Sequence, residues 1–301
     1  MQIKKVVVLT SGGDAPGMNS AIFGIWKECL DKNIELYGAI GGYEGLIDNN
    51  FIKIDYSILV GRINRGGSVL KSGRSPRFLK STYFNRALKN LKDNKFDGLI
   101  VLGGDGSLRG AIELRDAGVN VISIPATIDN DLNFTYTLGY DTATNNIVSV
   151  IDNITDSLNA FGYGAVIKIM GRNCTDLINN VAKSINTDLV ITKPDFDMKN
   201  LIKKINFIKK QQTIPPIVLV LEDVADTVAL ASTLQSECKI QMRPHILGYI
   251  QRGGSPSAFD RRYGITAGKL AVETLKDKEC VMIGLIGDNL TKKPFEECFK
   301  I

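Results

Sequence analysis

The chain is poor in the side chains from which most zinc centres and histidine-dependent sites are built. Its 301 residues contain a single histidine, His245, and five widely separated cysteines that form no C-x-x-C pair. A zinc site, a histidine-dependent triad and a disulfide framework are therefore not expected. We expect the cysteines to be reduced structural thiols, as is usual in the cytosol.

The sequence also lacks long apolar runs and dense basic blocks. No apolar stretch approaches the roughly 20 residues that a membrane-spanning helix requires, and the apolar run at the amino terminus is too short for a signal sequence. The net charge of +5 is modest and dispersed, so phosphorylated small molecules explain it as well as nucleic acid would. We expect a cytoplasmic protein that binds neither membrane nor nucleic acid.

Short β-branched runs alternate with longer helical patterns, which predicts an α/β fold with mainly parallel sheets and right-handed crossovers. Most predicted strands are continuous apolar stretches, typical of strands covered on both faces. They are Lys5–Thr10, Glu35–Ile40, Gly98–Leu102, Val121–Ile124, Ala165–Ile169, Leu189–Thr192, Ile217–Leu221, His245–Ile250 and Val281–Leu285. The predicted helices are Met18–Leu30, Phe84–Lys92, Ser107–Ala117, Thr142–Leu158, Asp176–Ser184, Met198–Lys209, Thr227–Gln235 and Tyr263–Lys276. The length allows two lobes or one large domain.

Two glycine-rich motifs follow predicted strands, at the edge where open α/β sheets bind ligands. In S-G-G-D-A-P-G-M-N, Gly12 and Gly13 permit a sharp turn and a close approach to a phosphate at the next helix start. In G-G-D-G-S (103–107), backbone amides could line an anion site while Asp105 holds Mg²⁺ directly or through water. Alone, the first motif is more often a plain structural turn, and the second is a structural turn as often as an anion site. Neither is a Walker A motif, and Arg109 breaks the dinucleotide fingerprint.

Further polar segments supply candidate catalytic and phosphate-binding groups. In P-A-T-I-D-N-D, Asp129 and Asp131 could divide a task, one accepting a hydroxyl proton and the other orienting metal or water. Such a cluster is also a common solvated turn. Arg243, and Arg252 in G-Y-I-Q-R-G-G-S-P, suit bidentate phosphate recognition, although isolated arginines are more often surface residues. Together the motifs indicate phosphoryl transfer.

In order and spacing, these motifs resemble those of the bacterial ATP-dependent 6-phosphofructokinases over nearly the whole chain. The resemblance rests on SGGDAPGMN, GGDGS, TIDND, MGR and QRGGSP. It implies two Rossmann-like lobes with mainly parallel sheets, an ATP-binding lobe of 1–139 plus 252–301 and a sugar-phosphate-binding lobe of 140–251. It also implies transfer of the γ-phosphoryl group of ATP, with Mg²⁺, to the 1-hydroxyl of fructose 6-phosphate in glycolysis. The family usually forms homotetramers.

The resemblance also implies residue roles. Asp129 resembles the general base, Thr127 and Arg172 the groups that contact the transferring phosphoryl, and Asp105 the magnesium-linked aspartate. The implied ATP contacts are Gly13, Arg74, Ser75, Gly104, Asp105, Gly106 and Ser107. The implied substrate contacts are Thr127, Ile128, Asp129, Met170, Gly171, Arg172, Glu222, Arg243 and Arg252. Gly106 favours ATP because pyrophosphate-dependent relatives carry an aspartate there, and the small neutral Ala126 points the same way.

The chain departs from the family pattern at the sugar phosphate and at the effector site. Tyr163 replaces an arginine and Tyr249 a histidine, so each supplies a neutral hydrogen bond but no charge. The loss is at most about 3–6 kcal/mol, or roughly 10²- to 10⁴-fold in affinity. The effector positions are Phe23, Lys27, Tyr56, Gly61, Thr155, Asp188 and Gln212. Positive charge remains only at Lys27, so we expect weak or absent regulation by ADP or phosphoenolpyruvate.

Two alternatives to this interpretation remain open. The chain could be a kinase for a different sugar or a nucleoside, with Tyr163 and Tyr249 stacking on the acceptor. It could also be a weakly active regulatory subunit paired with a standard kinase. Retention of Asp105, Thr127, Asp129 and Arg172 argues against the second alternative.

Overall fold

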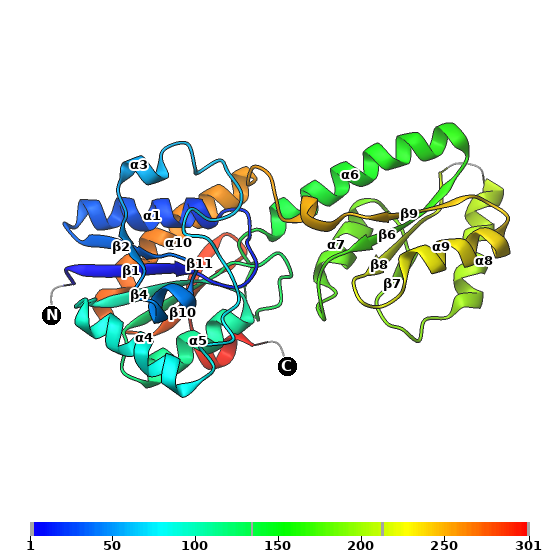
Figure 1. The fold of residues 1–301 in the computed structure, drawn as a ribbon. Coiled ribbons are helices and arrows are strands. Elements are labelled where there is room, and N and C mark those ends of the chain that lie inside the picture. The colour runs from blue at the N-terminus through cyan, green and yellow to red at the C-terminus, as the bar shows by residue number, and fades with distance from the viewer. Residues whose placement is uncertain (1–2, 134, 212–213, 300–301) are drawn as a thin grey trace. The chain divides into compact units, whose positions relative to one another are not determined.

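The computed structural model describes residues 3–133, 135–211 and 214–299, and the chain divides into two units (Figure 1). The first unit consists of Met1–Thr142 with Arg252–Ile301, and the second of Ala143–Gln251. Each unit has its own sheet and its own apolar core. The assignment of ATP to the first unit and the sugar phosphate to the second stays a prediction.

The first unit is built on a seven-stranded sheet in the order β11-β10-β5-β4-β1-β2-β3. The strands are β1 (Lys5–Thr10), β2 (Glu35–Ala39), β3 (Phe51–Lys53), β4 (Gly98–Gly103), β5 (Val121–Pro125), β10 (Val281–Ile286) and β11 (Asn289–Pro294). The edge strands β3 and β11 pair antiparallel with β2 and β10, and all other pairs are parallel. The predicted α/β fold with mainly parallel strands is therefore confirmed.

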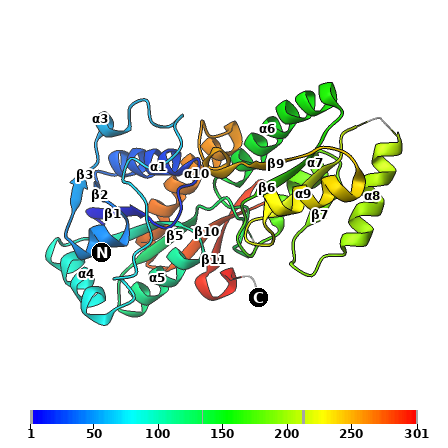
Figure 2. The same ribbon diagram turned by 45° about the vertical axis from the view of Figure 1, so that its right-hand side comes forward.

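Helices cover both faces of this sheet. They are α1 (Met18–Asp31), α2 (Tyr43–Ile47), α3 (Tyr56–Leu59), α4 (Ser81–Asp93), α5 (Asp105–Asp116) and α10 (Ala258–Thr274). Figures 1 and 2 both show α1 with α10 on one face and α4 with α5 on the other. None of the described helices combines the length and apolar character needed to span a lipid bilayer.

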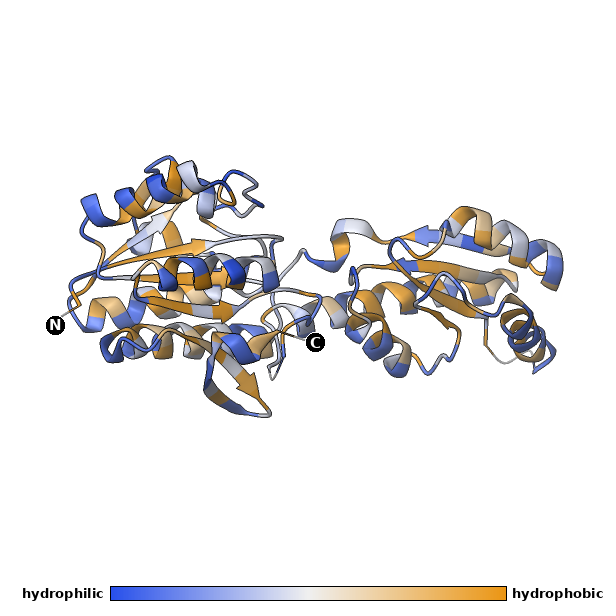
Figure 3. Ribbon diagram, turned by 90° about the horizontal axis from the view of Figure 1, so that it is seen from below, coloured by the Kyte–Doolittle hydropathy of each residue, from blue (hydrophilic) through white to orange (hydrophobic). Residues whose placement is uncertain are grey.

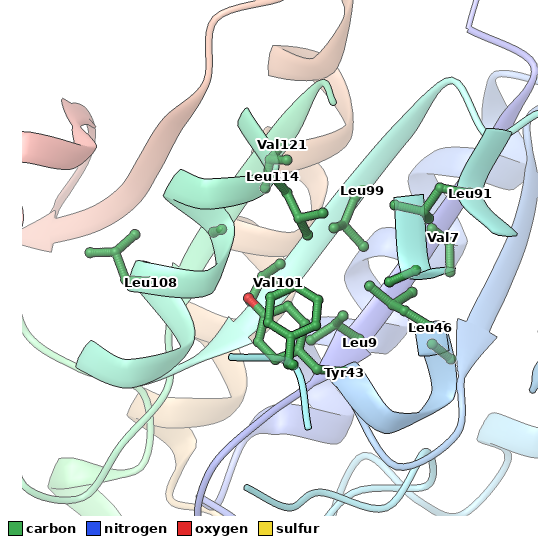
Figure 4. Packing of buried hydrophobic residues seen from close by; sticks show 14 of the residues in the cluster. Val7, Leu9, Tyr43, Leu46, Leu91, Leu99, Val101, Leu108, Leu114 and Val121 are labelled. Carbon is green, nitrogen blue, oxygen red and sulfur yellow. The ribbon is translucent and has the colours of Figure 1, made fainter. Parts of the chain in front are cut away.

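The core of the first unit forms where the central strands meet α2, α4 and α5. Val7 and Leu9 of β1 and Leu99 and Val101 of β4 are all fully buried there. Figure 4 shows these side chains packed among Tyr43, Leu46, Leu91, Leu108 and Leu114. In Figure 3 the strands are largely hydrophobic, whereas the helices carry hydrophilic stretches. The continuous apolar runs in the sequence thus correspond to strands covered on both sides.

The second unit is a four-stranded parallel sheet in the order β7-β8-β6-β9. Its strands are β6 (Gly164–Ile169), β7 (Val190–Ile191), β8 (Ile217–Leu221) and β9 (Met242–Ile246). Its helices are α6 (Tyr140–Phe161), whose first turn belongs to the first unit, α7 (Asp176–Ser184), α8 (Met198–Gln211) and α9 (Thr227–Cys238). A second core gathers Val166, Val218, Leu230 and Leu234.

Two predicted elements are displaced in the structure. The predicted strand His245–Ile250 is wrong, because β9 is Met242–Ile246 and Gly248–Gln251 form a 3₁₀ helix. Pro244 lies inside β9, which is tolerated since β9 is an edge strand that pairs only with β6. In addition, α5 begins at Asp105 rather than Ser107, so the anion site expected in a loop is the first turn of a helix.

A buried carboxylate ties α10 to the start of α6 within the first unit. Asp260 is fully buried and accepts hydrogen bonds from the Gly139 amide at 2.8 Å and the Thr142 amide at 2.9 Å. The Thr142 hydroxyl also donates to it. These bonds cap the amino terminus of α6. Burial is the main cause that raises the pKa of Asp260 to about 6.

Candidate active site

In both sheets the strand order reverses at a strand that precedes a predicted motif. In the first sheet β1 lies between β2 and β4, and in the second β6 lies between β8 and β9. Open α/β sheets bind ligands in the crevice at the carboxyl ends of such strands. Gly12 and Gly13 follow β1, Asp105 follows β4, and Met170 follows β6. The topology therefore places the sequence motifs at the expected ligand-binding edges.

The two glycine-rich motifs of the first unit pack against each other. The Ser11 amide donates to Leu102 O at 2.9 Å. A side chain at Gly103 would lie 2.3 Å from Ser107 Oγ and 2.7 Å from Ser11 O, so only glycine fits there. The first amides of a helix lack an acceptor within it. Those of Asp105 and Gly106 at the start of α5 can therefore bind an anion, aided by the helix dipole.

A third segment lies alongside this pair and brings Arg74 and Ser75 to it. The Gly12 amide donates to Gly73 O at 3.1 Å, and the Ser72 hydroxyl donates to Gly12 O at 3.0 Å. Arg74 is exposed. The hydroxyl of Ser75 instead donates to Glu44 Oε1 at 2.5 Å. Any nucleotide contact of Ser75 would therefore come from its backbone or from the lone pairs of its oxygen.

The T-I-D-N-D turn adjoins the G-G-D-G-S motif. A Cβ at Gly104 would lie 3.3 Å from Thr127 Cβ, and the Ala126 amide donates to Gly103 O at 2.9 Å. The Asp129 amide donates to Thr127 Oγ1 at 3.2 Å, and Asp129 is only 6% exposed. Asp129, the predicted base, is therefore only two residues from Thr127, which contacts the anion-binding turn at the start of α5.

Side chains outside the motif hold this turn in shape. The Thr137 hydroxyl donates to Thr127 O at 2.7 Å, and the Thr137 amide donates to Asn130 Oδ1 at 3.1 Å. Asn130 has a φ of 53°, which asparagine tolerates better than most residues. Ile128 is 6% exposed, so a substrate contact there would fall to its backbone. Sequence reasoning missed Thr137, whose partner Thr127 lies ten positions earlier.

Arg252, predicted to contact the sugar phosphate, lies beside the first glycine motif. Its Nη1 is 3.4 Å from where a Cβ of Gly13 would stand and 3.6 Å from Asp14 Oδ1. The Arg252 side chain is 27% exposed. It therefore contributes positive charge at the carboxyl end of β1.

In the second unit, Met170, Gly171, Arg172 and Glu222 form one cluster at the ends of β6 and β8. Glu222 Oε1 accepts from the Gly171 and Arg172 amides at 3.0 and 2.7 Å. Arg172 is exposed. Gln251, which sequence reasoning did not single out, accepts from the Met170 amide at 2.9 Å. Its place in Q-R-G-G-S-P was the only sequence signal available.

Arg243 does not join this cluster. It pairs in register with Ala165, five residues before Met170, which puts the two backbones about 16 Å apart along the sheet at roughly 3.3 Å per residue. Its guanidinium lies over the ring of Tyr163, 5.0 Å from the centroid, and that ring stacks on Phe161 at 5.4 Å. Tyr249, at the other departure from the family pattern, is 78% exposed.

Two of the predicted effector positions of the first unit belong to a row of aromatic side chains. Phe23 and Tyr56 flank Trp26, with ring centroids 5.6 and 5.8 Å from it. Lys27 is the neighbouring cation in the sequence. Gln212 lies outside the described residues.

Across residues 3–133, 135–211 and 214–299, no three His, Cys, Asp or Glu side chains gather as a metal site. Magnesium does not need such a cluster, because it usually takes one or two protein carboxylates together with water and substrate phosphates. Asp105, half-buried at the start of α5, offers one such carboxylate. The residues present therefore fit a nucleotide-borne magnesium ion.

Comparisons with known proteins agree with this arrangement. The family model for phosphofructokinase matches residues 5–275. The ATP-dependent 6-phosphofructokinase of Staphylococcus epidermidis is 38% identical over 302 residues, which cover 99% of this chain and 94% of that protein. These matches run through both units.

Solved structures share the fold. The phosphofructokinase of Pichia pastoris superposes with a TM-score of 0.90 at 24% identity, over 99% of this chain and 35% of that chain. This chain thus spans about a third of the Pichia protein. A pyrophosphate-dependent phosphofructokinase from Marinobacter aquaeolei superposes with a TM-score of 0.86 at 19% identity, over 98% of this chain and 83% of that chain. The fold alone therefore does not decide the phosphoryl donor.

Proposed function

Since the chain belongs to the phosphofructokinase family and is a phosphotransferase, we propose that it phosphorylates fructose 6-phosphate at the 1-hydroxyl with ATP. The observation that carries this proposal is the contact between the anion-binding turn and the turn of the predicted base. Gly104 lies so close to Thr127 that a Cβ at Gly104 would come within 3.3 Å of Thr127 Cβ. Asp129, two residues after Thr127, is nearly buried. Phosphates held by α5 would thus lie close to a carboxylate that can accept a proton.

The chemistry then depends mostly on positioning and charge neutralisation. Phosphoryl transfer has a loose transition state with charge spread over the phosphoryl oxygens. Asp129 would accept the proton of the sugar hydroxyl, while Arg172 and Thr127 would meet the phosphoryl oxygens. Bound magnesium, held through Asp105 and the phosphates, would neutralise part of this charge.

The donor is assigned from Gly106. This residue is exposed in the first turn of α5, and a Cβ built on it meets no atom within 4 Å. The open space suits a nucleotide whose phosphates extend over the helix start. Ala126, small and neutral beside Gly103, offers no charge that would select pyrophosphate instead.

The sugar phosphate would be gripped by fewer charges than is usual in the family, with Tyr163 and Tyr249 in place of two cationic groups. The position of Arg243, at the other end of β6 from Met170, supports a site completed by a second copy of the chain. We therefore propose a homo-oligomer, a tetramer by family resemblance, and a cytoplasmic glycolytic enzyme. The aromatic effector positions support weak or absent allosteric regulation.

A coupled assay on the purified chain tests the function directly. ATP is compared with pyrophosphate as donor, and fructose 6-phosphate with other sugar phosphates, free sugars and nucleosides as acceptors. We expect turnover with ATP and fructose 6-phosphate, at a high KM for the sugar. Turnover with an unphosphorylated acceptor instead would favour a kinase of different specificity, and inactivity without a second chain would favour a regulatory subunit.

The variant Asp129→Asn tests the role of the base. It should lower kcat by roughly 10²- to 10⁴-fold, the usual contribution of a general base, and leave the KM for ATP nearly unchanged. Asp116→Asn, which removes an exposed carboxylate from the far end of α5, is the control. Near-normal turnover of Asp129→Asn would remove Asp129 from the mechanism.

A further inference from the structure

Three consecutive backbone amides in the second unit donate to side-chain oxygens from distant parts of the sequence. The Met170 amide donates to Gln251 Oε1 at 2.9 Å, across 81 positions. The Gly171 and Arg172 amides both donate to Glu222 Oε1, at 3.0 and 2.7 Å. Two successive amides around one oxygen form an anion-binding concavity. The Glu222 carboxylate is therefore bound by the loop amides in the way that such a concavity binds an anion.

The loop backbone has positive φ at two successive residues, a conformation that glycine adopts readily and arginine does not. Gly171 has a φ of 147° and Arg172 a φ of 48°. A side chain at Gly171 would lie 2.8 Å from Cys174 O and 2.9 Å from Leu221 Cδ1. Left-handed backbone at a residue such as arginine persists only where the surroundings hold it. The two bonds to Glu222 are side-chain contacts that help to hold it here.

The oxygens that accept these bonds are themselves fixed by the sheet. Glu222 directly follows β8, and its amide donates to Ile169 O, the end of β6, at 2.8 Å. Gln251 is 1% exposed, and its Nε2 donates to Gly248 O at 3.1 Å. The backbone that presents the exposed Arg172 is thus anchored on both sides.

We propose that Glu222 is a positioning residue for Arg172, holding the loop backbone through Oε1 with support from Gln251. The inference rests on the proposed function, in which Arg172 meets the transferring phosphoryl group. It gives Glu222 a task besides the sugar contact that family resemblance implies. Positioning depends on the reach of the side chain to two amides, whereas a charge-dependent sugar contact depends on its ionisation.

Two conservative variants separate reach from charge. Glu222→Gln keeps the side-chain length and an oxygen acceptor but removes the charge. Glu222→Asp keeps the charge but is one methylene shorter, so its oxygen falls short of the two amides. Asp223→Asn removes the neighbouring exposed carboxylate and is the control, because asparagine tolerates the φ of 65° found there. The measurements are kcat and KM for each substrate, with thermal unfolding as a check on the fold.

We expect Glu222→Asp to lower kcat by about 100-fold, the order of loss caused by a displacement of about 1 Å in a catalytic group. Glu222→Gln should keep most of kcat and raise the KM for the sugar phosphate, and Asp223→Asn should match the unsubstituted chain. In an Arg172→Ala background, Glu222→Asp should add little, because the group it positions is gone.

The results that would overturn the positioning role of Glu222 differ from those that would overturn the proposed function. A loss of kcat in Glu222→Gln that equals or exceeds the loss in Glu222→Asp overturns the positioning role, as do independent losses in the double variant. The proposed function would survive both results. An unsubstituted chain that transfers no phosphoryl group from ATP to fructose 6-phosphate overturns the function and the inference together.

Discussion

Replacing Gly106 with aspartate should weaken ATP binding while leaving the fold intact. Gly106 is the second residue of α5, is exposed, and has no atom within 4 Å of its missing Cβ. An aspartate therefore fits without a clash. A carboxylate in the first turn of a helix also stabilises it by about 0.3–1 kcal/mol. We expect the free energy of unfolding to stay constant or to rise slightly.

The same carboxylate should repel a bound triphosphate. If the first-turn amides hold a phosphate, the new charge lies roughly 5 Å from it. At that distance, and at an effective dielectric constant of about 20, two unit charges repel by ~3 kcal/mol. This corresponds to roughly 10²-fold in affinity. Gly106→Ala adds the same Cβ without the charge and is the matched control.

Calorimetric titration with Mg-ATP and urea unfolding of all three chains measure the two effects separately. The alanine variant should bind ATP like the unsubstituted chain, and the aspartate variant about 100-fold more weakly. Affinity that is unchanged from the unsubstituted chain in both variants would mean that the nucleotide phosphates do not lie at α5. An equal loss in both would trace the effect to bulk rather than to charge.

The remaining predictions concern stability and regulation. Asp260 has its pKa raised from 3.8 to about 6, so the folded chain keeps a proton that the unfolded chain releases. Stability relative to Asp260→Asn should therefore fall by up to about 3 kcal/mol as the pH rises from about 4 to 6; a difference in urea unfolding that is constant over this range would refute the shift. ADP and phosphoenolpyruvate should leave the response to fructose 6-phosphate hyperbolic, and marked sigmoidal shifts in initial rate would contradict the expectation that the effector site is eroded.

The elements that the sequence predicts well are those whose burial leaves a continuous apolar signal. Strand β1, for example, runs through four fully buried residues, Val6–Leu9, and its bounds match the prediction. The unpredicted strands β3 and β11 lie at the sheet edges and carry exposed or polar residues, such as Ile52 at 40% exposure and Lys292. Their pairing depends on a neighbouring strand rather than on a pattern of their own.

The residues of the candidate site also differ in how well the sequence predicts them. The glycines of the two motifs are readable from the sequence because a turn and a close approach between nearby segments require them. The bonds from Glu222 and Gln251 that hold the loop of Arg172 are not readable from the sequence. These acceptors lie 50 and 81 positions from the amides they bind, and the fold of the second unit brings them together. Arg243 is a different case. It was grouped with the other sugar-phosphate contacts by motif, yet the parallel register of β6 and β9 sets it five residues from Met170. The sequence can therefore name a candidate phosphate-binding arginine, whereas its distance from the other candidates becomes visible only in the register of the strands, and its contact with the sugar phosphate stays a prediction.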